Sequence, residues 1–164
     1  MSADGGVFIG LGANLGDRAD TIARAVECLR AQPDIEIVRV STLHRTAPWR
    51  VLDQPEFLNA VVEIATQLPP AKLVLRLLTI ERELGRERAD AARWSARIID
   101  LDLLLFGDRI VDEPGCRVPH PHLHEREFAL RPLLEIAPSV VIPGRGSASD
   151  WLDQLESKPE AATA

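Results

Sequence analysis

The sequence predicts an α+β fold, a ferredoxin-like β-α-β-β-α-β antiparallel sheet with helices and a C-terminal helical extension. Two observations predict it. Segments rich in β-branched residues, or alternating between polar and apolar side chains, indicate strands, and longer segments with apolar residues at helical spacing indicate helices. Their order along the chain is strand, helix, strand, strand, helix, strand, which is the split βαβ arrangement with both helices on one face of the sheet.

The first strand and the first helix meet at a glycine-rich junction. Val7–Leu11 is a short apolar run typical of a buried strand. The helix after it should begin at Asp17, because an aspartate side chain accepts hydrogen bonds from the free N–H groups at a helix N-terminus. Its expected apolar stripe consists of Ala19, Ile22, Ala23, Val26 and Leu29.

Two strands and a second helix follow. Ile35–Ser41 alternates as a strand does, and Phe57–Thr66 is rich in β-branched residues. Between them we expect a turn-rich loop from His44 to Pro55. Pro69 and Pro70 should open the second helix, and Gly85 should follow its last turn as the C′ glycine. The expected apolar stripe of this helix consists of Leu73, Val74, Leu77, Leu78, Ile80 and Leu84.

The last predicted strand lies in the apolar run Ile98–Phe106 and carries Asp100 and Asp102. Side chains at i and i+2 of a strand point to the same face, so the two carboxylates should stand side by side. Beyond Gly107 we expect a loop and a helical extension, which Pro132 should break or kink. The expected core contacts of this extension are Phe128, Leu130, Leu133, Leu134 and Ile136.

The composition predicts one globular domain over residues 1–164, with a frayed tail from about residue 157. A formal net charge of −6 argues against general binding to nucleic acids or acidic membranes. The chain shows neither a signal-peptide pattern nor an apolar run of about eighteen residues. Of the two cysteines, Cys28 should lie in the core and Cys116 in a loop, so we expect no disulfide, a cytoplasmic location and a monomer.

An arginine cluster precedes the two aspartates. Five of the nineteen basic residues fall between Arg82 and Arg97, against three acids, so this segment has a local charge of +2 in an acidic chain. A polyanionic ligand would relieve the repulsion among these arginines. Two adjacent carboxylates are hard oxygen ligands that suit Mg²⁺ bound with nucleotide phosphates. Together, the cluster and Asp100 with Asp102 predict a polyphosphate site.

Gly10, Gly12 and Gly16 suggest one competing function, dinucleotide binding. Their spacing is one residue longer than the usual fingerprint, and the next strand lacks the acidic residue that would bind the ribose. The glycines are more simply explained by a tight turn from strand to helix. The chain also contains no G-x-x-x-x-G-K-[ST] motif, which excludes a P-loop enzyme.

Two further alternatives involve metal and RNA. Alternate histidines at 120, 122 and 124 could chelate zinc in an extended segment, but no thiolate pair helps them. We favour His120, neutral or protonated, as a donor to a phosphate. A ferredoxin-like sheet can instead form a non-enzymatic nucleotide- or RNA-binding module, but such sheets stack bases on strand aromatics and this chain has no tyrosine and four phenylalanines.

Four segments resemble the 6-hydroxymethyl-7,8-dihydropterin pyrophosphokinase family of folate biosynthesis. They are Gly10–Asp17; Arg45–Pro48 with Asp53–Ala60; Glu81 with Gly85–Arg86 and Arg97–Asp102; and Val118–His120 with Arg126–Leu130. The resemblance extends roughly from Val7 to Pro138. It implies transfer of a pyrophosphoryl group from ATP to the hydroxymethyl oxygen of the reduced pterin, with AMP as the other product.

The resemblance also implies roles for individual residues. Asp100 and Asp102 would hold two Mg²⁺ ions, and Arg86 and Arg97 would join them as catalytic residues. The implied ATP-binding residues are Glu81, Arg86, Arg88, Trp94, Arg97, His120 and Arg126. The implied pterin-binding residues are Thr46, Ala47, Trp49, Phe57, Asn59 and Phe128. In this scheme Phe57 and Phe128 stack on the two faces of the ring, and Asn59 binds its amide-like edge.

Overall fold

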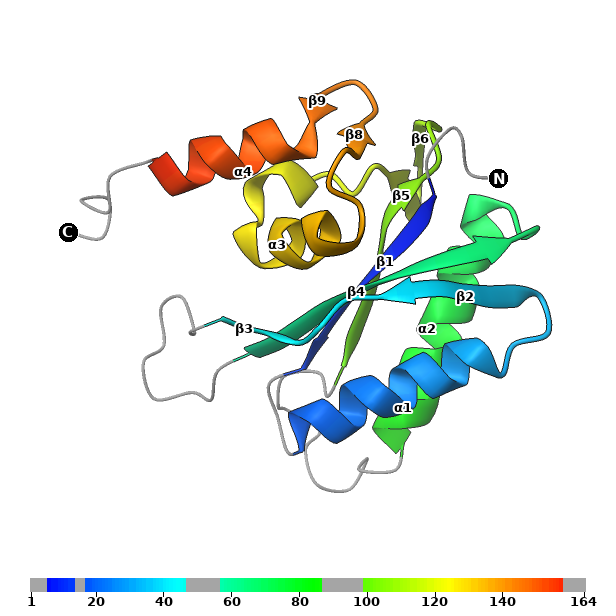
Figure 1. Cartoon of the computed structure of the whole chain (residues 1–164). Coiled ribbons are helices and arrows are strands. Elements are labelled where there is room, and N and C mark those ends of the chain that lie inside the picture. The colour runs from blue at the N-terminus through cyan, green and yellow to red at the C-terminus, as the bar shows by residue number, and fades with distance from the viewer. Residues whose placement is uncertain (1–5, 14–16, 47–56, 87–98, 158–164) are drawn as a thin grey trace.

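A computed structural model describes residues 6–13, 17–46, 57–86 and 99–157 of the chain. Within these ranges the elements follow one another as shown in Figure 1. They are β1 (Val7–Ala13), α1 (Arg18–Arg30), β2 (Ile35–Val40), β3 (His44–Thr46), β4 (Phe57–Thr66), α2 (Pro70–Arg86), β5 (Asp100–Phe106), β6 (Val111–Glu113), β7 (Cys116–Val118), the 3₁₀ helix η2 (Leu123–Glu125), α3 (Glu127–Ile136), β8 (Val141–Ile142), β9 (Gly146–Ser147) and α4 (Ala148–Ser157).

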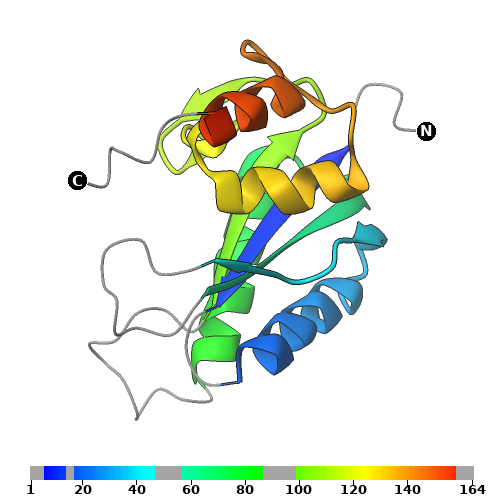
Figure 2. The same cartoon turned by 60° about the vertical axis from the view of Figure 1, so that its left-hand side comes forward.

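The main sheet has the strand order β2-β4-β1-β5, with β3 paired beside β2 along the same edge of β4. Every pairing in it is antiparallel. The two strands that flank α1 and the two that flank α2 thus interleave, which confirms the predicted ferredoxin-like topology. Helices α1 and α2 lie on one face of the sheet, while α3 and α4 lie on the other (Figures 1 and 2).

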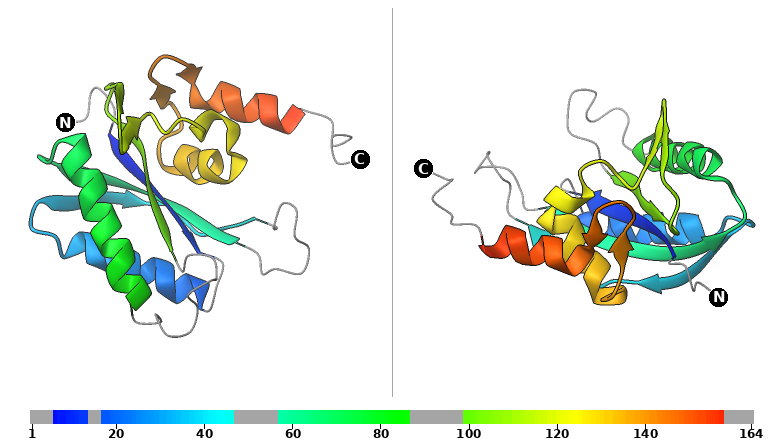
Figure 3. Two further views of the ribbon diagram at one scale, coloured as in Figure 1. Left: turned by 180° about the vertical axis from the view of Figure 1, so that it is seen from behind. Right: turned by 90° about the horizontal axis from the view of Figure 1, so that it is seen from above.

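Two apolar cores therefore share one sheet. The views from behind and from above show helices on both faces of this sheet (Figure 3). The core beneath α1 and α2 includes Ile9, Leu11, Ile22, Leu29, Val62, Leu73, Leu77, Ile80 and Leu101. The core beneath α3 and α4 includes Phe8, Val61, Leu104, Leu123, Leu130, Leu133 and Ile136. Side chains that alternate along β1, β4 and β5 divide between these two cores, and this division determines which residues reach each face.

Helix α1 begins as predicted but exposes part of the predicted stripe. The Asp17 carboxylate accepts a hydrogen bond from the backbone N–H of Asp20 at 3.1 Å, which caps the helix. The buried face consists of Thr21, Ile22, Ala25, Val26 and Leu29, so the burial expected for Ala19 and Ala23 was wrong. The large side chains at 22, 26 and 29 orient the helix, because an alanine has little apolar area with which to compete.

Helix α2 corrects the expectation for Gly85. The helix extends to Arg86, so Gly85 lies inside it and does not act as a C′ residue. A Cβ atom added at Gly85 would meet nothing within 4 Å. The stripe is buried at Leu73, Leu77, Ile80 and Leu84, whereas Leu78 remains 39% exposed.

Three further expectations need correction. Within the expected loop from His44 to Pro55, residues 44–46 form strand β3, and the rest of that loop lies outside the described residues. Cys116 belongs to β7 and is buried, and this burial raises the pKa of its thiol. Helix α3 continues through Pro132 without a break, at the loss of the backbone hydrogen bond that this residue cannot donate.

The remaining expectations concern the ends of the chain and the core of α3. Leu130, Leu133 and Ile136 are buried and Leu134 is partly buried, but Phe128 is 39% exposed and was wrongly expected in the core. Within the described ranges, no helix combines the length and apolar character needed to cross a membrane. Residues 158–164, most of the expected frayed tail, lie outside the described residues.

Candidate functional site

A row of residues crosses the sheet from β4 to β5. In β1, Gly12 pairs with Asn59 of β4 on one side and with Asp100 of β5 on the other. Residues directly opposite in antiparallel strands project to the same face, so Asn59 and Asp100 share a face. Because the residue between them is a glycine, no side chain separates the amide from the carboxylate. With adjacent strands about 4.8 Å apart, the two backbones lie roughly 10 Å apart.

The next row repeats this pattern one step further into the sheet. Gly10 pairs with Val61 of β4 and with Asp102 of β5. Two glycines at alternate positions of β1 therefore place no β1 side chain beside either aspartate, but the Leu104 side chain covers Gly10, so only Gly12 leaves a bare floor, next to Asn59 and Asp100. The expectation that these glycines serve a tight turn was wrong for Gly10 and Gly12, since both lie inside the strand, while Gly16 lies outside the described residues. A glycine at i and i+2 of a strand is a sequence signal for close approach of a ligand or another backbone.

The face that carries these rows is the one covered by α3. Leu101 and Leu103 are buried in the core beneath α1 and α2, so Asp100 and Asp102 project to the opposite side. Both aspartates are only half-buried, and the side chain of Asp102 is 41% exposed. The prediction that the two carboxylates lie together on one face is confirmed by this register.

Glu81 reaches the same end of β5 from the other layer. Its Oε2 accepts a hydrogen bond from the backbone N–H of Leu101 at 2.7 Å. The carboxylate thus satisfies a backbone donor on a strand at the edge of the sheet. Beside it lies a groove of about 310 Å³ between α2, β5 and the segment that contains β7. The groove is lined mainly by Val74, Leu77, Leu78, Cys116, His120 and Pro121.

His120 is held as a neutral ring. Its backbone N–H donates to the carbonyl oxygen of Leu104 at 2.9 Å, and its Nδ1 accepts from the backbone N–H of His122 at 3.1 Å. Burial lowers the pKa of His120 to about 4, with further contributions from the charges of Arg126 and His122. A neutral imidazole whose Nδ1 is an acceptor carries its proton on Nε2. His120 therefore offers one N–H donor to a ligand. Of the neutral and protonated forms that the sequence left open, the lowered pKa favours the neutral one.

Arg126 connects Asp102 to α3. One guanidinium nitrogen, Nη1, lies 3.8 Å from Oδ2 of Asp102, and the guanidinium carbon lies 5.5 Å from the centre of the Phe128 ring. Phe128 stands in the first turn of α3, which packs on β3 and β4. Phe57 belongs to the same face of β4 as Asn59, two residues earlier. The exposed ring of Phe128 and the half-buried ring of Phe57 thus come from two layers that face each other.

The structure brings eight of the sequence-predicted site residues to this end of the sheet. They are Phe57, Asn59, Glu81, Asp100, Asp102, His120, Arg126 and Phe128. The backbones of Thr46 and Arg86 are described, at the ends of β3 and α2, but their side chains are not. Ala47, Trp49, Arg88, Trp94 and Arg97 lie outside the described residues. In the described part of the chain, no three His, Cys, Asp or Glu side chains form a cluster that could hold a metal by themselves.

Sequence reasoning missed one further group beside this site. Glu135 of α3 is bonded to Thr42 and His44, and His44 pairs with Asn59 across β3 and β4. Glu135 lies more than ninety residues after Thr42 and His44 in the chain, so no local sequence pattern could predict the contact. The register of the strands was needed to find it.

Comparison with known proteins agrees with the family resemblance found in the sequence. Residues 8–138 match the family model described as 7,8-dihydro-6-hydroxymethylpterin-pyrophosphokinase (HPPK). Over 137 residues the chain is 46% identical to 2-amino-4-hydroxy-6-hydroxymethyldihydropteridine pyrophosphokinase of Methylorubrum extorquens, covering 84% of this chain and 85% of the relative. The protein of the same name from Aquifex aeolicus is 39% identical and covers 84% of this chain and 83% of its own length.

Solved structures share the fold. A Plasmodium falciparum HPPK-DHPS chain superposes with a TM-score of 0.67 over 90% of this chain, at 15% sequence identity. The present chain spans only 45% of that longer protein. At this identity the likeness concerns the fold alone.

Proposed function

The chain belongs to the 7,8-dihydro-6-hydroxymethylpterin-pyrophosphokinase family, and from this membership we infer that it transfers pyrophosphate from ATP to the hydroxymethyl group of 6-hydroxymethyl-7,8-dihydropterin. The products are AMP and the pterin diphosphate, in folate biosynthesis. The observation that supports the proposal is the row Asn59, Gly12 and Asp100: an amide that would bind the polar edge of the pterin and a carboxylate that would bind Mg²⁺ share one face, with only a glycine between them.

The pterin would occupy the floor on the Asn59 side. A buried amide offers both a donor and an acceptor to the amide-like edge of the ring. Phe57 from the sheet and Phe128 from α3 would stack on its two faces, since offset stacking suits a flat heteroaromatic ring. Thr46, Ala47 and Trp49 would complete this subsite.

ATP would occupy the floor on the β5 side and the groove beside it. The apolar wall of α2 suits a purine ring, and Glu81 lies at its end. The Nε2–H of His120 and the guanidinium of Arg126 would donate to phosphate oxygens. Arg86, Arg88, Trp94 and Arg97 would enclose the nucleotide from the arginine cluster.

The reaction is metal-dependent, as a kinase reaction with ATP implies. Asp100 and Asp102 would hold two Mg²⁺ ions, and the donor set fits them: two half-exposed carboxylates project from one face of β5, and the strand neighbour of Asp100 is Gly12. Mg²⁺ is commonly bound by one or two carboxylates, with water and substrate phosphates as its other ligands. Bound here, the ions would neutralise phosphate charge and fix the phosphate chain.

The protein groups act mainly by positioning and by charge. The nucleophile is the primary alcohol of the substrate, so holding it in line with the phosphate chain matters more than covalent catalysis. Arg97 directly precedes the aspartate strand and would stabilise charge as it redistributes in the transition state. We assign no protein side chain as general base. The chain would act as a single domain and as a cytoplasmic monomer.

The decisive experiment measures nucleotide products. The purified chain is incubated with ATP and Mg²⁺, with and without the reduced pterin alcohol, and AMP and ADP are separated by chromatography. AMP that depends on the pterin supports the proposal, and an Asp102→Asn preparation serves as the control for contaminating ATPases. ADP as the product would indicate an ordinary kinase. Nucleotide binding without turnover would indicate the alternative, a non-enzymatic binding module.

A further inference from the structure

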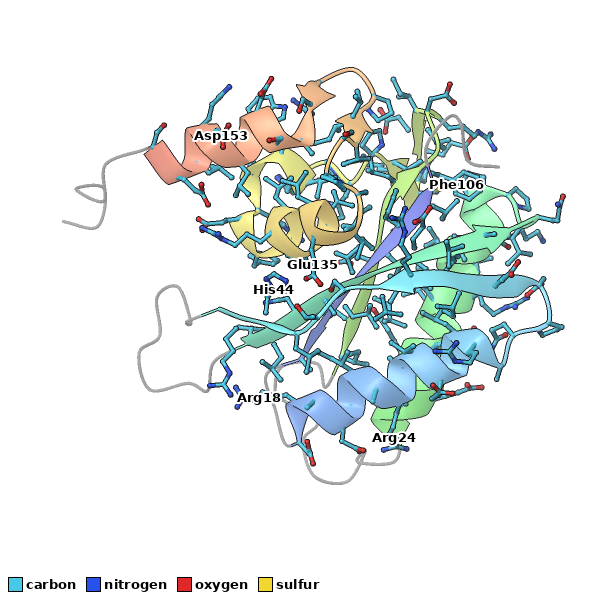
Figure 4. The ribbon with its side chains drawn as sticks, in the orientation of Figure 1. Arg18, Arg24, His44, Phe106, Glu135 and Asp153 are labelled. Atoms are coloured by element: carbon cyan, nitrogen blue, oxygen red, sulfur yellow. The ribbon has the colours of Figure 1, made fainter. Side chains whose placement is uncertain are left out.

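Glu135 holds the segment that joins β2 to β3. Its Oε2 accepts the backbone N–H of Thr42 at 2.9 Å, and its Oε1 accepts the Thr42 hydroxyl at 2.9 Å. Oε1 also lies 2.8 Å from Nε2 of His44. These hydrogen bonds lower the pKa of Glu135, with the one to His44 contributing most. Figure 4 shows Glu135 and His44 close together between α3 and the sheet.

The segment that Glu135 holds contains one residue too many for regular pairing. Val40 pairs with Val62, whereas His44 pairs with Asn59, so four steps along this edge oppose three steps along β4. The extra residue makes Ser41–Leu43 a bulge. Ser41 keeps the ladder intact there, since its N–H donates to the Val61 carbonyl and its hydroxyl oxygen accepts the Val61 N–H, both at 2.9 Å.

A bulge must be held at one position, because a slip of one residue would turn every side chain of β3 to the other face. The backbone N–H of Thr42 is the donor that the bulge diverts from the ladder, and Glu135 accepts it. With that donor fixed, His44 stands opposite Asn59, and Thr46 stands opposite Phe57. Glu135 thus fixes the register of the strand that borders the pterin subsite.

Glu135 also links this strand to the opposing aromatic wall. Phe128 and Glu135 are seven residues apart in α3, which is about two helical turns, so they lie on the same face of the helix. The helix packs on β3 and β4, and Phe128 and Glu135 flank its buried residues Ala129, Leu130, Leu133 and Ile136. The bond from Glu135 to Thr42 and His44 therefore ties the helix that carries Phe128 to the strand pair that carries Phe57 and Asn59.

We propose that Glu135 is a positioning residue for the pterin: by pinning the bulge at Thr42 and the ring of His44 to α3, it keeps Asn59, Phe57 and Phe128 at the spacing that the ring requires. This inference rests on the proposed function for the identity of the ligand. It assigns Glu135 no contact with the substrate.

The test compares Glu135→Ala with the conservative Glu135→Gln, whose amide oxygen can still accept from Thr42. In Glu135→Ala we expect the KM for the pterin to rise roughly three- to ten-fold, since a half-exposed hydrogen-bond network is partly replaced by water. The KM for ATP should stay within about two-fold of wild type, a change smaller than the tenfold that a single strong contact provides. Glu135→Gln should recover much of the loss. Glu156→Ala is the matched control: it also removes a carboxylate that pairs with a side chain of α3, but Glu156 lies in α4 and its partner is Arg131.

Two further measurements separate positioning from general destabilisation. Hydrogen exchange should show faster exchange over residues 41–46 in Glu135→Ala, and direct fluorescence titration of the pterin gives its affinity without turnover. An unchanged pterin affinity in Glu135→Ala, or an equal rise in KM for both substrates, overturns the proposal. If Glu135→Ala does not fold, Thr42→Val and His44→Phe are used, and unchanged pterin affinity in both has the same meaning. Failure of the proposed function is a different result, namely that the wild-type chain forms no pterin-dependent AMP.

Discussion

The bare floor between Asn59 and Asp100 can be tested by adding a single methyl group. In Gly12→Ala, the new Cβ would lie 3.0 Å from Oδ1 of Asn59 and 4.0 Å from the carbonyl oxygen of Leu58. Ordinary contacts of a Cβ begin at 3.4 Å, so the Asn59 amide must yield by several tenths of an ångström. Asn59 is only 6% exposed, which leaves it little room to adjust.

The size of the effect follows from what Asn59 does in the proposed site. A displaced amide weakens its hydrogen bonds to the pterin, each worth about 0.5–1.5 kcal/mol net. We therefore expect the KM for the pterin to rise by about three- to thirty-fold, at roughly 1.4 kcal/mol for each factor of ten. The free energy of unfolding should change less than the pterin affinity, because the backbone entropy that alanine recovers in a strand, about 0.5–1 kcal/mol, offsets part of the cost of displacing the buried amide.

The assay measures pterin and ATP affinity together with the free energy of unfolding by denaturant. Two other glycines provide matched controls. In Gly10→Ala the Cβ would meet only the Leu104 side chain, 3.3 Å away, so any cost should appear in stability rather than in pterin affinity. In Gly85→Ala the Cβ meets nothing within 4 Å, and the gain in helix propensity should stabilise the protein by about 0.5–1 kcal/mol.

One result would refute the reasoning. If Gly12→Ala binds the pterin as tightly as wild type while remaining folded, the amide of Asn59 does not read the ring. The floor between the two subsites would then lack the role proposed for it.

Three other perturbations test the remaining parts of the site. Asp100→Asn and Asp102→Asn should each abolish most AMP formation at saturating Mg²⁺ without lowering the melting temperature, and near-normal rates in either variant would remove the metal assignment. Phe57→Ala and Phe128→Ala should each weaken pterin binding by about 1–3 kcal/mol, measured by titration with a nonhydrolysable ATP analogue present, while nucleotide affinity is retained. The depressed pKa of His120, about 4 against an ordinary 6.5, means that the unfolded chain binds a proton that the folded chain does not between these two values. The free energy of unfolding should therefore fall as the pH drops from 6.5 to 4, by at most about 3 kcal/mol from this residue. The variant His120→Gln should show a weaker dependence of the free energy of unfolding on pH over this range. An unchanged dependence would show that His120 is not buried as a neutral ring.

Local sequence patterns were sufficient for most of the ferredoxin-like fold. Phe57–Thr66 could be predicted as a strand from its β-branched residues, and Pro70–Arg86 as a helix from apolar residues at helical spacing, without knowing the partners of either element. The pair Asp100 and Asp102 could be placed on one face for the same reason, because alternation along a strand is a local property.

The parts that could not be predicted depend on distant residues. Strands of three residues, such as β3 and β7, are too short to show a period, so Cys116 read as a loop residue. The position of Gly12 between Asn59 and Asp100 could not be predicted, because these two partners belong to strands much later in the chain. The same is true of Glu135, whose contact with Thr42 depends on how α3 packs over β3.

The two-sided covering of the sheet has a consequence for the substitutions that this protein can accept. Every residue of β4 from Leu58 to Ile64 is buried, because α1 and α2 cover one face and α3 covers the other. Most positions of β2, in contrast, are partly or fully open to solvent. Sequence drift should therefore be concentrated in β2 and should nearly avoid β4, where even the charged Glu63 is 3% exposed and paired with Arg39. In most antiparallel strands every second residue faces solvent and accepts substitutions. In β4 both faces are buried, so we expect no such alternation between tolerant and intolerant positions.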